Sequence, residues 1–118
     1  EPITVFGEKK TLDFTYVDDC VAGVVRGIEK LISGEVQNQT VNLAYGEGHT
    51  LIELVGYIGK ALGKNPKMTV EPAKQTGEVS YYIADIGKAR NLLGYNPETD
   101  LESGVQKAVA WWKEYYHK

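Results

Sequence analysis

Apolar residues recur with helical spacing in four stretches of the chain. In the first stretch they form one stripe at three- to four-residue intervals, which is the pattern of an amphipathic helix. A glycine follows three of the stretches close to the point where a helix would end. The pattern predicts four helices, over residues 18–32, 51–62, 85–93 and from about residue 100 onward.

Acidic and hydroxyl residues mark where two of these helices begin. Asp18 and Asp19 open the first helix, and we interpret both carboxylates as caps of its free amide groups. A catalytic acid and base pair is the alternative reading of the same two residues. Thr50 and Glu53 have the spacing of a capping box before the second helix. Cys20, which lies among valines, is interpreted as a small buried side chain rather than an activated thiolate.

Runs of β-forming residues lie between the predicted helices. Leu12, Phe14 and Tyr16 alternate with polar residues, which is typical of a half-buried strand over 11–17. Further strands are predicted over residues 3–6, 40–44 and 68–70, and a loop over 72–78. The order of elements predicts a mixed α/β fold with short strands, four helices and no complete Rossmann domain. Because residues 40–44 resemble an interior strand that needs neighbours on both edges, we expect an apolar face to be exposed.

Composition restricts the class of protein. The 118 residues have room for one domain, 1–118, and with 42% hydrophobic and 25% charged residues the chain is expected to fold. A net charge of −3 gives no general reason to bind nucleic acid or anionic lipid. No apolar run approaches the roughly 20 residues that span a membrane, and the N-terminus has no signal-peptide pattern, so we expect a cytoplasmic protein. The single cysteine excludes an internal disulfide.

Few residues offer catalytic or metal chemistry. His49 and His117 each lack a second histidine within helical reach, and we assign neither to a metal or to catalysis. Gly46-Glu47-Gly48 lies between a predicted strand and a helix, where a glycine-rich turn can hold a phosphate. We favour a plain tight turn, because the third glycine of a dinucleotide fingerprint would fall at Leu51. The sequence therefore predicts no catalytic residue and no metal site.

Four motifs follow one another along nearly the whole chain. They are Leu-Asp-Phe-Thr-Tyr-Val-Asp-Asp at 12–19, Val-Asn-Leu at 41–43 with Gly46, Gly48 and Thr50, Gly-Glu-Val at 77–79 followed by 84–97, and 101–105 with Trp111-Trp112. In this order they resemble the motifs of the extended short-chain dehydrogenase/reductases, the NAD-dependent sugar-nucleotide epimerases and dehydratases. They are most similar to the UDP-glucose 4-epimerase-like members.

This resemblance implies the C-terminal, substrate-binding part of such an enzyme, with a UDP-sugar as substrate. The family's GxxGxxG motif and its catalytic Tyr-x-x-x-Lys pair are absent, and none of the eight tyrosines has a lysine four residues later. NAD would then belong to the parent protein, together with an N-terminal Rossmann domain that this chain lacks. The chain begins at Glu1-Pro2 without an initiator methionine, and we interpret it as a fragment that is not catalytic alone.

The resemblance also implies where the substrate would bind. Two arginines that clamp the substrate pyrophosphate in the family are replaced by Leu12 and Gln75, and Glu78 matches an aspartate that bonds the ribose. Lys74 is the nearest cation that could compensate, although it lacks the bidentate geometry of a guanidinium. The missing arginines leave open an alternative, a non-catalytic scaffold or protein-interaction module derived from that family.

Overall fold

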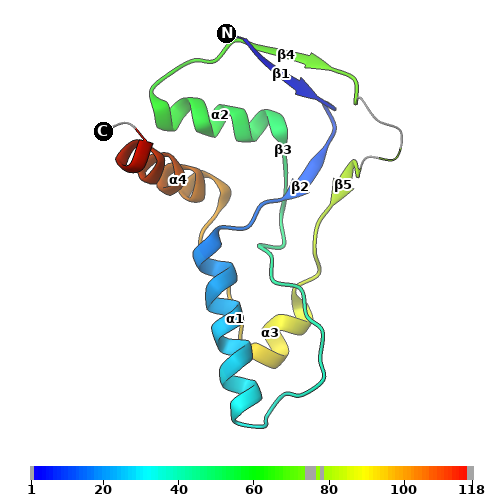
Figure 1. Cartoon of the computed structure of the whole chain (residues 1–118). Helices are drawn as coiled ribbons and strands as arrows, with labels where there is room; N and C mark the ends of the chain where they lie inside the picture. Colours follow the sequence, from blue (N-terminus) through cyan, green and yellow to red (C-terminus); the bar gives the residue numbers. More distant parts are fainter. Residues whose placement is uncertain (1, 74–76, 78, 117–118) are drawn as a thin grey trace.

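The computed structural model describes residues 2–73, 77 and 79–116, and within them it confirms the predicted mixed α/β class with short strands and four helices (Figure 1). The elements in chain order are β1 (Ile3–Phe6), β2 (Thr11–Asp13), α1 (Val17–Ile32), β3 (Gly48–Thr50), α2 (Leu51–Leu62), β4 (Met68–Glu71), β5 (Tyr81–Tyr82), α3 (Gly87–Leu93) and α4 (Leu101–Tyr116).

The molecule is flat and extended. Its radius of gyration is 17.2 Å and its extents are 53 × 41 × 18 Å, whereas a compact domain of this length has a radius of about 13.5 Å. α2 and α4 lie side by side at one end, and α1 and α3 lie together at the other, with the strands between and above them (Figure 1). The largest buried cluster is correspondingly small and surrounds Tyr95 and Ala89 of the α1–α3 end.

The strands form two small sheets. β1 pairs with β4 in parallel, with Ile3 opposite Met68. β2 is the centre of a second sheet, antiparallel to β3 and parallel to β5. β2 ends at Asp13, shorter than the predicted strand over 11–17, because its partners on both sides are only two or three residues long.

Residues 40–44 do not form the predicted strand. Among the described residues, none pairs with them in a sheet, and a strand exists only with a hydrogen-bonded neighbour. The chain instead pairs a few residues later, at β3, where Gly48 permits a close approach: a Cβ there would lie 2.6 Å from side-chain atoms of both Thr11 and Ile83. β5 was not predicted, because it is too short to show a period.

The start of α1 corrects the predicted caps. α1 begins after Tyr16, which makes no side-chain capping bond. Asp18 is exposed, whereas Asp19 is buried and accepts hydrogen bonds from the backbone N–H groups of Glu98 (3.1 Å) and Thr99 (2.9 Å). The Asp19 carboxylate therefore joins α1 to the segment before α4, about 80 residues away, instead of capping α1.

Asp13 holds two other distant segments in the same way. Its carboxylate accepts hydrogen bonds from the backbone N–H groups of Tyr45 (3.1 Å), Gly46 (2.9 Å) and Ala84 (3.2 Å). The first two amides belong to the turn before β3, and the third belongs to the segment that leads to α3. Asp13 thus fixes both segments to the end of β2.

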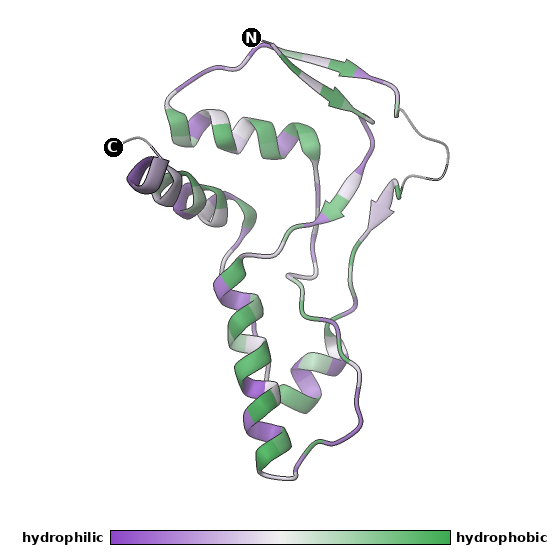
Figure 2. Cartoon of the chain, viewed as in Figure 1, coloured by the Kyte–Doolittle hydropathy of each residue, from purple (hydrophilic) through white to green (hydrophobic). Residues whose placement is uncertain are grey.

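In a self-contained domain the apolar face of a helix is buried, whereas in α1 the apolar face is exposed and the opposite face packs inward. The inner face carries Gly23, where a Cβ would lie 2.7 Å from a methyl of Leu43 and 3.0 Å from the Tyr95 ring. Hydrophobic residues recur along α1 (Figure 2). Those of the predicted apolar stripe form its outer face, which is exposed. Its residues are Val17, Val21, Val24, Val25, Ile28, Leu31 and Ile32, each 47% or more exposed. The expectation of an exposed apolar face is confirmed here.

The remaining helix signals are mostly confirmed. Thr50 and Glu53 form the predicted capping box, in which the Thr50 amide donates to Glu53 at 2.6 Å and the Glu53 amide donates to Thr50 at 3.2 Å. Gly63 and Gly94 end α2 and α3 in the left-handed conformation. α3 starts at Gly87 rather than Asp85, because the Asp85 carboxylate accepts from the Gly87 amide.

Gly23 tests the close contact behind α1. Gly23→Ala is expected to lower the free energy of unfolding by about 1–3 kcal/mol, because the added methyl overlaps Leu43 and Tyr95. Gly56→Ala is the matched control, since Gly56 lies inside α2 with nothing within 4 Å of its Cβ, and alanine there should stabilise by about 0.5–1 kcal/mol. Urea unfolding of both variants is the measurement. Equal effects at the two glycines would contradict the packing.

Asp18 and Asp19 test the role of the Asp19 hydrogen bonds, because the two neighbouring aspartates differ in burial and in hydrogen bonding. Asp19→Asn should destabilise the fold by about 1.5–3 kcal/mol, because it weakens two charge-assisted bonds at a buried position. Asp18→Asn should change stability by less than about 0.5 kcal/mol. If both carboxylates acted as helix caps, the two variants would instead lose similar amounts in the same unfolding measurement.

Candidate functional site

The central strand of the three-stranded sheet carries Leu12, the one predicted binding residue that the structure describes. Leu12 is half-buried, lies directly opposite His49 of β3 and is paired with Tyr82 of β5. Side chains directly opposite each other on antiparallel strands project from the same face, so Leu12 and His49 are neighbours on one face. Asp13, the next residue, projects from the other face, where it holds the turn at Tyr45.

The other three predicted binding residues, Lys74, Gln75 and Glu78, lie outside the described residues. The chain returns from this part of the sequence at Ser80, whose carbonyl accepts a hydrogen bond from the Thr11 amide at 2.9 Å. β5 then continues beside β2. The sheet therefore brings the end of the 72–80 segment next to Leu12, although about 70 residues separate them in sequence.

His49 is a neighbour that the sequence analysis did not assign to the site. Its Nε2 lies 3.8 Å from Glu47 Oε2 and its Nδ1 lies 3.7 Å from Glu53 Oε2. Both ring nitrogens are buried and form no hydrogen bond in the described part of the chain. Only the pairing of β3 with β2 reveals this proximity to Leu12, since no sequence signal connects the two positions.

The carboxylates around His49 are held by helix starts. The backbone amide of Thr50 donates to Glu53 and, as the largest effect, lowers the pKa of that carboxyl. Asp100 accepts from the Ser103 amide at the start of α4, which lowers the pKa of Asp100. Both groups are therefore carboxylates at neutral pH, and they make this side of the sheet acidic.

The glycine-rich turn before β3 is a poor candidate for phosphate binding. Its Tyr45 and Gly46 amides already donate to the Asp13 carboxylate. Gly46 has φ +87°, which favours glycine, and a Cβ there would lie 3.1 Å from Ile86. The two amides thus hold an internal anion, which supports the interpretation of 46–48 as a structural turn, with Gly48 already inside β3.

Burial raises the pKa of two tyrosines near this turn. The Tyr95 hydroxyl donates to the carbonyl of Ala44 at 2.8 Å, and burial, the largest effect, raises its pKa to about 12. Burial also raises the pKa of Tyr45, with a smaller contribution from Glu47. Both hydroxyls stay protonated at neutral pH, so neither is suited to act as a general base there.

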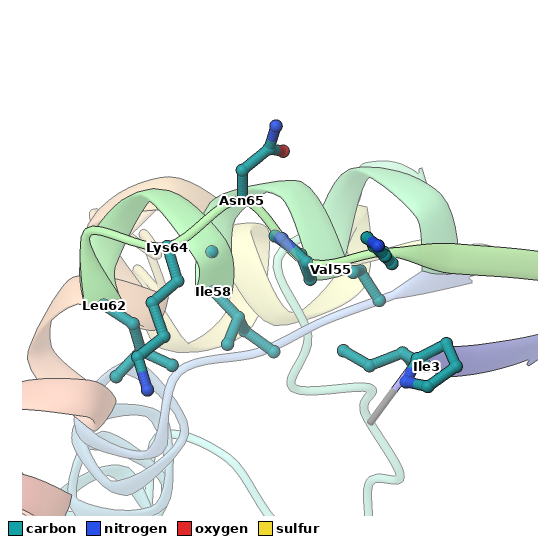
Figure 3. A pocket seen from close by; sticks show the side chains of 10 residues that line it. Ile3, Val55, Ile58, Leu62, Lys64 and Asn65 are labelled. Atoms are coloured by element: carbon teal, nitrogen blue, oxygen red, sulfur yellow. The ribbon is translucent and has the colours of Figure 1, made fainter.

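A cavity of about 590 Å³ lies between β1, α2 and the 64–67 segment. Ile3 of β1 faces Val55 and Ile58 of α2 across it, while Asn65 points away (Figure 3). Leu12, the one predicted binding residue that the structure describes, does not line this cavity, and most of its β1 and α2 lining is apolar. We therefore do not assign it to the substrate.

The described residues show neither a metal-binding group of side chains nor a helix that could span a membrane. They contain no group of three or more His, Cys, Asp or Glu side chains that could hold a metal ion. Cys20 is partly exposed on α1 rather than buried, which corrects the sequence-based interpretation. None of the described helices combines the length and the apolar character that crossing a membrane requires.

Comparison with known proteins identifies relatives along nearly the whole chain. No protein-family model matches it. An uncharacterised UDP-glucose epimerase of Bacillus subtilis is 32% identical over 117 residues, which are 98% of this chain and 36% of the relative. UDP-glucuronate 4-epimerase 1 of Arabidopsis thaliana is 32% identical over an alignment of 129 positions, gaps included, which covers 98% of this chain and 30% of the relative. The chain thus spans about a third of the length of the curated relatives that it matches.

A solved structure shares the fold as well as the sequence. The UDP-glucuronic acid 4-epimerase of Bacillus cereus, in complex with UDP-glucuronic acid and NAD, superposes with a TM-score of 0.85 and is 30% identical. The match covers 98% of this chain and 36% of that protein. By sequence and by fold, nearly the whole chain is therefore similar to the C-terminal third of UDP-sugar 4-epimerases of the extended short-chain dehydrogenase/reductase family.

Proposed function

We propose that the chain supplies the sugar-nucleotide-binding part of an NAD-dependent UDP-sugar 4-epimerase. The observation that carries this proposal is the match, over 98% of the chain, to the Bacillus cereus enzyme solved with UDP-glucuronic acid and NAD. The substrate class is a UDP-hexose or a UDP-hexuronic acid, because the relatives named for UDP-glucose and for UDP-glucuronate are equally similar to this chain.

The reaction of the parent protein is an exchange of configuration at C4 of the sugar. NAD, held by the rest of the parent protein, would supply a reversible hydride acceptor for that carbon. The residues of this chain bind and orient the nucleotide sugar. The sequence contains neither the glycine-rich dinucleotide motif nor a Tyr-x-x-x-Lys pair, so we propose that the chain alone has no turnover and that NAD binds the rest of the parent protein.

The face of the sheet around Leu12 is the proposed position of the substrate pyrophosphate. The pairing of β5 with β2 supports this proposal, because it brings the end of the segment with Lys74, Gln75 and Glu78 next to Leu12. Glu47 and Glu53 make the His49 side of this face acidic. A dianionic pyrophosphate needs compensating cations, which makes Lys74 the side chain that we propose as its contact.

A non-catalytic scaffold derived from the same family is the second candidate. One observation favours it: Leu12, an apolar residue, stands at the centre of β2 where the family has a phosphate-binding arginine. A scaffold would retain the fold and its interfaces but have no measurable affinity for a nucleotide sugar.

Activity measurements separate the two candidates. The parent protein with NAD should interconvert UDP-glucose or UDP-glucuronic acid with its C4 epimer. Chromatography of the products measures this conversion. The 118-residue chain alone should give no product and no heat of NAD binding. Turnover by the chain alone, or a micromolar NAD affinity, would contradict the proposal, and a parent without affinity for any UDP-sugar would favour the scaffold.

Restoring the missing arginines tests the proposed pyrophosphate position. In the parent protein, Leu12→Arg together with Gln75→Arg should tighten UDP-sugar binding at least tenfold, because each charge-assisted bond to phosphate contributes about 1.5–3 kcal/mol. Lys74→Ala should weaken binding, whereas Lys64→Ala, at the distant cavity, should not. Calorimetric titration gives the dissociation constants of the UDP-sugar. An unchanged or weaker affinity of the double variant would contradict the proposed position of the pyrophosphate.

A further inference from the structure

The side chain of His49 is held in the fold without a hydrogen bond. Only 22% of it is exposed, and both of its ring nitrogens are buried and unpaired within the described residues. Buried polar atoms in proteins are nearly always paired, so an unpaired imidazole requires an explanation. Its ring nitrogens retain the capacity to bond to a group from outside the described chain.

The two ring nitrogens face carboxylates that are held to different degrees. Nδ1 lies 3.7 Å from Glu53 Oε2, and the Thr50 amide donates to that same oxygen at 2.6 Å. Nε2 lies 3.8 Å from Glu47 Oε2, and the Glu47 side chain is 64% exposed with no hydrogen bond among the described residues. A second anion can therefore replace Glu47 at Nε2 while Glu53 keeps its place at Nδ1.

The charged side chains that the described chain places beside His49 are carboxylates from three segments. Glu47 belongs to the turn before β3, Glu53 to α2, and Asp100 precedes α4. Amides at the starts of α2 and α4, with a smaller contribution from His49, lower the pKa of Glu53 and of Asp100. Since a histidine changes its charge between about pH 5 and 8, His49 is the member of this cluster that can become a cation there.

We propose that His49, as its imidazolium, donates a hydrogen bond from Nε2 to the substrate pyrophosphate, so that nucleotide-sugar binding strengthens as the pH falls. His49 lies directly opposite Leu12, where Cβ atoms are about 4.5–5.5 Å apart. An anion held over Leu12 is therefore within reach of the imidazole. The inference rests on the proposed function, because it adds a second contact, beside Lys74, at the proposed pyrophosphate position.

Protonation also removes the main objection to an anion at this place. With a neutral imidazole, Glu47 and Glu53 make this side of the sheet acidic and repel a phosphate. An imidazolium offsets one of these charges and becomes a donor at both nitrogens. Glu53 then stabilises the charged ring at Nδ1, and Nε2 donates to the phosphate.

UDP-glucose is the probe that isolates the titration of the protein. A terminal phosphate loses its second proton with a pKa of about 6, which would mask a histidine. The pyrophosphate of UDP-glucose is a diester without that ionisation, and its sugar is uncharged. Any change of its affinity between about pH 5.5 and 8.5 therefore arises from groups of the protein.

Calorimetric titration of the parent protein with UDP-glucose, with NAD present, tests the contact. Binding should be at least tenfold tighter at about pH 5.5 than at about pH 8.5, because a hydrogen bond to a charged group contributes at least that factor. His49→Gln should bind with the weaker affinity at both pH values. His49→Arg, which is charged throughout, should bind with the tighter affinity at both. His117→Gln, at the other histidine of the chain, is the matched control and should keep the original pH profile.

Proton uptake separates a contact to the substrate from a purely structural role. Titrations near neutral pH in two buffers of different ionisation enthalpy give the number of protons bound together with UDP-glucose. The parent protein should take up protons on binding, whereas His49→Gln and His49→Arg should take up none at this site. A histidine that only supports β3 would change the affinity without changing the proton count.

The remaining outcomes overturn the inference. Equal pH profiles of the parent protein and His49→Gln would exclude the contact, as would a His49→Arg variant that binds no more tightly than His49→Gln. If His49→Gln fails to fold, an unaltered parent protein that takes up no proton on binding excludes it as well. Absence of UDP-glucose binding at every pH contradicts the proposed function and this inference with it, whereas binding that is independent of His49 contradicts the inference alone.

Discussion

Hydrogen bonds from backbone amides to two buried or half-buried carboxylates hold this chain together. Asp13 and Asp19 lie on either side of the junction between β2 and α1, and between them they accept five amide donors. The donors lie in irregular segments 32 to 80 residues away along the chain. A hydrogen bond to a charged group contributes more than a neutral one, which matters in a flat molecule whose largest buried cluster is small.

These bonds also determine what the site can be. Since Asp13 projects from one face of β2 to hold the turn at Tyr45, Leu12 must project from the other, beside His49. Two amides of the glycine-rich turn, which a phosphate would need as donors, already donate hydrogen bonds to Asp13. Phosphate binding therefore depends on side chains from the segment before β5, and the proposed function assigns it there.

Local signals made the helices predictable. The Thr50–Glu53 box and the glycines at 63 and 94 act within a few residues of the helix ends, and all of them appear as expected. The strands were less predictable because each depends on a distant neighbour: the sequence of 40–44 favours a strand, yet no described segment pairs with it. Asp19 was misassigned for the same reason, since a carboxylate at a helix start looks alike whether it caps that helix or binds a segment 80 residues away.

For the candidate site, the resemblance to a family predicted Leu12, and the structure added its neighbour His49, which only the register of β2 and β3 reveals. The binding roles of Leu12, Lys74, Gln75 and Glu78 all stay predictions. The hydrophobic pattern of α1 likewise did not predict how the helix is oriented. An apolar stripe shows which face of a helix is suited to burial, but not which part of the protein packs on that face. Gly23, which the sequence analysis did not single out, lies against Leu43 and Tyr95 and marks the side that faces inward.

Asp13 and Asp19 fix irregular segments of the chain that secondary structure does not hold. Native-state hydrogen exchange of the five donor amides, those of residues 45, 46, 84, 98 and 99, measures this directly. These amides should exchange at least a hundredfold more slowly than other loop amides, such as those of residues 37–39. Exchange of all five at the rate of the 37–39 amides would show that the two carboxylates do not fix these segments.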